Sequence, residues 1–99
     1  MKVKIKLSKR KGKKRVAIFY DDDNNKLKTT HFGAKGMSDY TIHKDKKRKE
    51  RYMKRHKVNE NWNDPTTAGS LSRYILWNKP TLKASIEDYR KRFKIKKYP

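Results

Sequence analysis

Two basic segments carry the side chains with the clearest chemistry in this sequence. Segment 44–57 (KDKKRKERYMKRHK) contains nine Lys or Arg residues in fourteen, and segment 90–97 (RKRFKIKK) contains six in eight. On helices these cations would point to most sides and neutralise several phosphates, so binding would weaken steeply as salt rises. Phosphate contacts carry no sequence information, so we expect sequence-nonspecific binding to nucleic acid, with DNA as the expected ligand. The predicted contact residues are Lys44, Lys46, Lys47, Arg48, Lys49, Arg51, Lys54, Arg55, Arg90, Lys91, Arg92 and Lys94.

Three aromatic residues, Tyr52, Phe93 and Tyr98, lie within or beside these basic segments. Exposed rings there would stack on unpaired bases. At helical spacing the same rings would instead form a buried stripe, with the charges left on a solvated face. We favour the buried stripe for the rings. For the charges we favour polyanion binding, because solubility alone does not require a net charge of +20.

No set of residues matches a catalytic or metal site. His31, His43 and His56 have no cysteine partners and lack the spacing of convergent metal ligands. The acidic run 21–23 favours a turn, since Asp and Asn side chains bond their own backbone. The loop 33–38 has the composition of a phosphate-cradling loop before a helix but lacks the P-loop pattern, and a plain link from sheet to helix explains it equally well. We therefore predict a non-enzymatic binding protein with no cofactor and no metal.

The segment 61–81 (NWNDPTTAGSLSRYILWNKPT) differs from the rest because it has two tryptophans and few charges. Such a segment either closes the core against the sheet or forms a docking surface for another protein, and both roles can coexist in a small domain. As a docking surface it would use aromatic anchors, with the surrounding charges steering assembly. The anchors would be Trp62, Tyr74 and Trp77.

The composition limits both the size of the protein and its class. Ninety-nine residues make one small domain with a thin core. Thirty Lys and Arg against ten Asp and Glu imply a polyanionic partner: nucleic acid first, and an acidic protein surface or an anionic membrane second. The absence of cysteine excludes disulfides and thiolate zinc sites. The longest apolar run, 74–77, is too short to span a membrane and no signal peptide is evident, so we expect a soluble protein inside a cell or a particle.

The N-terminal third predicts a β-meander within residues 1–35. Apolar residues alternate with lysines over 3–7, which is the period of a half-buried strand. Residues 15–20 are apolar on both faces and should form the central strand, and 27–32 should form the third. Because turn residues separate these runs, we predict an antiparallel sheet of three strands.

The remaining two-thirds predict helices. A basic helix is expected over 38–58, with Ser38 as its N-cap, followed by a helical C-terminal part over 64–97. Within that part Thr81 should cap the last helix. The fold class is therefore α+β, a small N-terminal antiparallel three-stranded sheet followed by two or three helices, in a single basic domain over 1–99.

Several segments of the sequence carry a resemblance to a known family: 36–45, 48–56, 60–62, 68–77 and 79–86, together with Tyr89 and Phe93. Through them the sequence resembles an uncharacterised family of small basic proteins from nucleocytoplasmic large (giant) DNA viruses. The resemblance covers roughly residues 15–95 and is most specific in the C-terminal half. It implies a viral source and a virion component, found in the host cytoplasm or nucleus during infection, and it supplies no catalytic residues.

Charge and resemblance together lead to two functional expectations. The first is a small basic structural protein of the virion that binds the packaged DNA through its Lys/Arg-rich segments. The alternative is a minor capsid or cement protein that docks to acidic surfaces of capsid proteins through its Trp/Tyr-rich segment.

Overall fold

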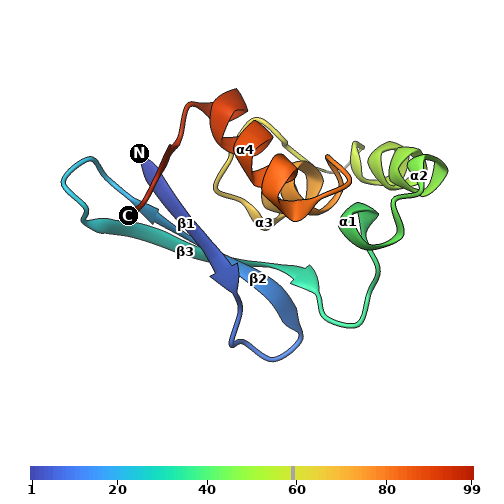
Figure 1. Ribbon diagram of the computed structural model, residues 1–99, viewed down its shortest axis with the longest axis horizontal. Coiled ribbons are helices and arrows are strands. Elements are labelled where there is room, and N and C mark those ends of the chain that lie inside the picture. Colours follow the sequence, from blue (N-terminus) through green and yellow to red (C-terminus); the bar gives the residue numbers. More distant parts are fainter. Residues whose placement is uncertain (59) are drawn as a thin grey trace.

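The computed structural model describes residues 1–58 and 60–99 and shows an α+β fold (Figure 1). Three strands come first, helices follow, and a short strand returns to the sheet at the C-terminal end. A π-helical segment over Ser72–Leu76 directly continues α3. The other elements are β1 (Lys2–Leu7), β2 (Lys13–Tyr20), β3 (Lys26–Ala34), α1 (Tyr40–His43), α2 (Lys46–His56), α3 (Ala68–Leu71), α4 (Leu82–Phe93) and β4 (Lys96–Lys97).

The sheet has the strand order β3-β2-β1-β4. The first three strands pair antiparallel and β2 is central, so the predicted meander is confirmed. The prediction of three strands is wrong, because Lys96–Lys97 pairs parallel to β1 as a fourth strand. This strand is short and fully basic, so its residues look like a continuation of the basic helix before them. That helix ends where Lys94 adopts a left-handed backbone (φ 55°), and Ile95 is then buried as the chain turns back to the sheet.

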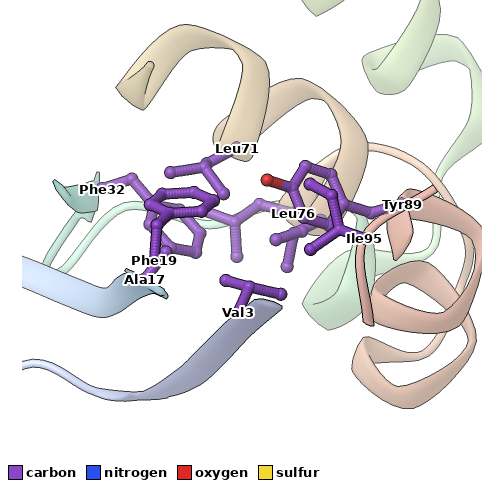
Figure 2. Packing of buried hydrophobic residues seen from close by; sticks show 9 residues of the cluster. Val3, Ala17, Phe19, Phe32, Leu71, Leu76, Tyr89 and Ile95 are labelled. Carbon is purple, nitrogen blue, oxygen red and sulfur yellow. The ribbon is translucent and has the colours of Figure 1, made fainter. Parts of the chain in front are cut away.

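The core lies between the inner face of the sheet and the C-terminal half of the chain (Figure 2). Strand residues such as Phe19 and Phe32, both fully buried, face Leu71, Ile75 and other apolar residues of the helical part. Tyr89 of α4 is buried with them, and its hydroxyl donates a hydrogen bond to the Pro65 carbonyl oxygen at 2.6 Å. The polar atom of this ring is therefore satisfied inside an apolar cluster.

The basic helix predicted over 38–58 is two helices, α1 and α2. Asp39, not Ser38, is the N-cap of α1, and its carboxylate accepts a hydrogen bond from the Thr41 amide. Lys44 then takes a left-handed backbone (φ 56°). Asp45 caps α2 by accepting hydrogen bonds from the Lys47 and Arg48 amides. Because an N-cap residue has a non-helical backbone, this cap interrupts the continuous helix and lets α2 leave in a new direction. The predicted cap of the last helix, Thr81, is confirmed.

Candidate nucleic-acid interface

The orientation of α2 is fixed by one buried ring, Tyr52. Tyr52 stacks on Trp77 with ring centroids 4.3 Å apart and planes 3° apart, and His56 stacks on Tyr52 at 4.2 Å. Burial raises the pKa of the Tyr52 hydroxyl to about 12, so the ring stays neutral at physiological pH. Stacking of aromatic rings stabilises a fold by more than the burial of their apolar surface alone. Here the stack holds one face of α2 against Trp77, the residue that follows the π-helical segment.

Lys49 lies on this same packing face. The sequence predicted it as a phosphate contact, but its ammonium group is engaged within the fold. Its ammonium group donates a hydrogen bond to the Asn78 carbonyl oxygen at 2.6 Å and lies 5.0 Å from the ring centroid of Tyr40. Desolvation lowers the pKa of the Lys49 ammonium, and the nearby cation of Arg73 lowers it further. Lys49 therefore anchors α2 to the rest of the domain, while its neighbours remain available to a ligand.

The other predicted cations of segment 44–57 are exposed, and the arginines and the lysines lie on different sides of α2. The arginines follow one another at spacings of three and four residues, which places them along one side of the helix, next to the packing face. The lysines lie around the rest of the exposed surface. Arginine presents a planar fork of donors that matches a phosphate in two contacts, whereas lysine offers a compact point charge. The arginines are Arg48, Arg51 and Arg55, and the exposed lysines are Lys44, Lys46, Lys47 and Lys54.

These three arginines line a groove of about 290 Å³, which we call the arginine groove. Its opposite wall is formed by Met37 and Ser38, from the loop between β3 and α1, and by Trp77; Tyr52 also lines it. Met37 is 66 % exposed. No carboxylate is among the lining residues, and no ion pair engages the three arginines within residues 1–58 and 60–99. The groove therefore combines uncompensated positive charge with apolar and aromatic surface.

A second cleft, of about 340 Å³, adjoins the arginine groove. The two share Met37, Ser38, Tyr52, Arg55 and Trp77 among their lining residues. One of its cations, Lys14, is compensated, because its ammonium lies 2.6 Å from an Asp39 carboxylate oxygen and both side chains are largely buried. Gly33 lines the same cleft with φ +79°, and a Cβ there would lie 2.7 Å from a Leu76 methyl carbon. A side chain larger than glycine would therefore clash at this position. The cleft is of mixed charge, because Asp39 and Glu60 line it together with Lys13, Lys14 and Arg55.

The predicted basic segment 90–97 lies elsewhere. In Figure 1 α2 lies at one end of the long axis, whereas the C-terminal end of α4 lies near the middle and the chain runs from there away from α2. The two segments therefore do not form one patch. Arg90 donates a hydrogen bond to the Ile95 carbonyl oxygen, and Arg92 forms an ion pair with Asp88 at 3.4 Å. Lys91 and Lys94 are exposed. This segment offers fewer uncommitted cations than α2.

The three predicted docking anchors are each half-buried and engaged within the fold. Trp62 donates its indole hydrogen bond to a Glu60 carboxylate oxygen at 2.8 Å. Tyr74 lies edge-on to Phe93, and the guanidinium carbons of Arg73 and Arg92 lie 4.9 and 4.8 Å from its ring centroid. Trp77 stacks on Tyr52 as described. The aromatic segment thus contributes to packing, and through Trp77 it also forms one wall of the arginine groove.

The other two interleaved rings also have partners inside the fold. Phe93 contacts Tyr74 and Tyr89, and Tyr98 stacks on Tyr20 with ring centroids 3.7 Å apart. The three rings do not form one buried stripe, because only Tyr52 is buried, while Phe93 and Tyr98 are partly exposed and contact other partners. Met37 and Ser38 line the arginine groove but were not among the predicted site residues, since Ser38 was expected only as a helix cap. The only sequence signal was their place in the loop 33–38, which precedes a helix.

Comparison with known proteins gives one match. A family model described as a family of unknown function, DUF5754, matches residues 3–56. The chain belongs to this family. No curated protein and no solved structure matches the sequence. The DUF5754 match covers β1 to β3 and ends with α2, so the three arginines and Met37 fall inside it while Trp77 lies outside.

Two further findings concern the described residues of this DUF5754 protein. Within residues 1–58 and 60–99, no group of three or more His, Asp or Glu side chains could hold a metal ion. In the same residues no helix is long and apolar enough to cross a membrane. The arrangement in the arginine groove supports binding of an anion.

Proposed function

We propose that this chain binds nucleic acid, DNA above all, through the arginine groove and the exposed lysines of α2. The observation that carries the proposal is the alignment of Arg48, Arg51 and Arg55 on one groove without a carboxylate among its lining residues. Arginines in uncompensated rows are well suited to the repeated phosphates of a nucleic-acid backbone. Each phosphate they neutralise releases counterions, which supplies the free energy of binding.

The proposed binding is independent of base sequence. Groups that contact phosphates position a protein on the duplex but do not distinguish bases. The rings nearest the arginines, Tyr52 and Trp77, already stack on each other and are not free to read bases. We therefore assign the groove to the sugar–phosphate backbone, with Met37 and the edge of Trp77 contacting the sugars.

We also propose that the protein is a non-enzymatic structural component of a large DNA virus particle, where it binds the packaged genome. The resemblance to small basic proteins of such viruses supports this setting. The alternative, docking to capsid proteins through Trp62, Tyr74 and Trp77, has no specific support, because those rings are engaged within the fold.

Fractionation of particles tests the setting and the ligand together. Purified particles would be disrupted gently, treated with nuclease and separated into soluble and shell fractions, and this chain would be followed by immunoblot. We expect release with the digested DNA, and no release from an identical sample without nuclease. Retention with the shell after complete digestion would contradict genome binding and favour the capsid alternative, and absence from particles would contradict the virion role.

A further inference from the structure

One edge of the sheet is open along most of β1. The short strand β4 pairs only with Lys2 and Val3, and the last backbone hydrogen bond on this side runs from the Tyr98 amide to the Val3 carbonyl oxygen at 3.0 Å. In the part of the chain that the structure describes, no strand pairs with this side of β1 beyond Val3. Tyr98 and Pro99 follow β4 and lie next in register beside Lys4 and Ile5, but no backbone hydrogen bond joins them to Lys4–Leu7 in the described residues. The edge of β1 is therefore unpaired over these four residues.

The register shows which backbone groups this edge offers. The Ser8 amide donates to the Lys14 carbonyl oxygen, so the even-numbered residues of β1 exchange hydrogen bonds with β2. In an antiparallel ladder the alternate residues point their amide and carbonyl groups the other way. Ile5 and Leu7 therefore direct their backbone donors and acceptors outward, as an edge strand does before it receives another strand.

An apolar groove of about 580 Å³ lies beside this open edge, and we call it the edge groove. Val3 and Ile5 of β1 line it together with Leu82 and Ile86 of α4, and the C-terminal residues 97–99 line it as well. Ile5, Leu82 and Ile86 are only partly buried, and Leu7, just past the groove, is 67 % exposed. A strand added to β1 would direct alternate side chains into this groove, because side chains alternate between the two faces of a sheet.

The charge around the edge groove is positive. Lys83, Arg90 and Lys97 line it, with Glu87 as the acidic side chain. On the opposite face of β1, Lys4 and Lys6 would flank the side chains of an added strand that point away from the groove. A segment fitting both faces would alternate apolar residues with Asp or Glu. A second copy of this chain does not fit, because it would bring its own net charge of +20 against these lysines.

We propose that the open edge of β1 binds an extended, acidic segment of another protein, with alternating apolar and acidic residues, as an added strand. The backbone hydrogen bonds of Ile5 and Leu7 would give affinity, and the edge groove would select apolar side chains at alternate positions. This site is separate from the arginine groove and does not rest on nucleic-acid binding. It gives the protein a second surface, able to attach a partner while α2 holds DNA.

Amide hydrogen exchange measured by NMR tests the proposal residue by residue. In the free protein the amides of Ile5 and Leu7 should exchange at least about tenfold faster than those of Lys4 and Lys6, which bond to β2. A synthetic peptide of alternating Val and Glu should then slow Ile5 and Leu7 by about tenfold or more. A peptide of the same composition with its Val and Glu residues in two blocks is the control for simple charge attraction. Equal protection by both peptides, or binding without protection of these two amides, would overturn the proposal.

Leu7→Pro provides the matching variant. It removes one outward amide, and the side chain it replaces is mostly exposed, so the β1–β2 ladder and the core keep their contacts. We expect the affinity for the alternating peptide to fall about tenfold, while Leu7→Ala, which keeps the amide, stays within about twofold of the wild type. Circular dichroism would check that both variants are folded. Equal affinities for the two folded variants would contradict strand addition.

Discussion

Replacing Arg48, Arg51 and Arg55 together by Ala should weaken binding to a short DNA duplex by about two to three orders of magnitude at about 0.1 M salt. The reason is the counterion release that each phosphate contact provides. The plot of log K against log salt has a negative slope, and three lost contacts should reduce its steepness by about 2.7, at about 0.9 for each contact. Fluorescence anisotropy at several salt concentrations would measure both the affinity and the slope.

The matched control removes the same charge from another place. Lys91, Arg92 and Lys94 lie at the end of α4, away from the arginine groove, and Arg92 is already paired with Asp88. We expect their replacement by Ala to reduce the steepness of log K against log salt by less than half as much as the replacement of Arg48, Arg51 and Arg55. Equal losses from the two triple variants would show that net charge alone drives binding, and the arginine groove would then have no special role.

Trp77→Ala should have the second large effect, this time on stability. The ring stacks on Tyr52, lies 5.3 Å from the His43 ring centroid and forms a wall of the arginine groove. Truncating a packed tryptophan costs about 3–5 kcal/mol in a core, and we expect about 2–4 kcal/mol here because Trp77 is half-buried. Urea unfolding followed by circular dichroism would measure the change in the free energy of unfolding.

Trp77→Phe is the control for this prediction. A smaller ring can still stack on Tyr52, so Trp77→Phe should keep most of the stability and place α2 as in the wild type. Trp77→Ala should also weaken DNA binding even at temperatures where it is folded, because α2 loses its support. If Trp77→Ala is as stable as the wild type, the anchoring of α2 described above is wrong.

Much of the sheet could be predicted from the sequence, because strand signals here are local. Residues 16–19 are all apolar, and this run marks β2 as the central strand. β4 could not be predicted, since two lysines carry no strand pattern and their pairing depends on Lys94 turning the chain. Its place in the sheet comes from burial of Ile95, which is a tertiary effect.

The candidate site was predicted in its residue types but not in its geometry. Charge density identified segment 44–57, yet it could not show that Lys49 is an anchor and that Arg48 belongs to a groove. That distinction depends on how α2 is rotated, which the Tyr52–Trp77 stack fixes across 25 residues of sequence. Met37 could not be found for the same reason, because only the folded chain brings its loop opposite α2.

The most direct test of the arginine groove is an NMR titration of the ¹⁵N-labelled protein with a short DNA duplex. The two tryptophans give separate indole signals, and only Trp77 lines the groove, so Trp62 is an internal control. We expect the Trp77 indole and the side-chain Nε–H signals of Arg48, Arg51 and Arg55 to shift in parallel, while the Trp62 indole stays in place. Shifts confined to segment 90–97 or to the β1–β2 turn, with the Trp77 and arginine signals unchanged, would contradict it.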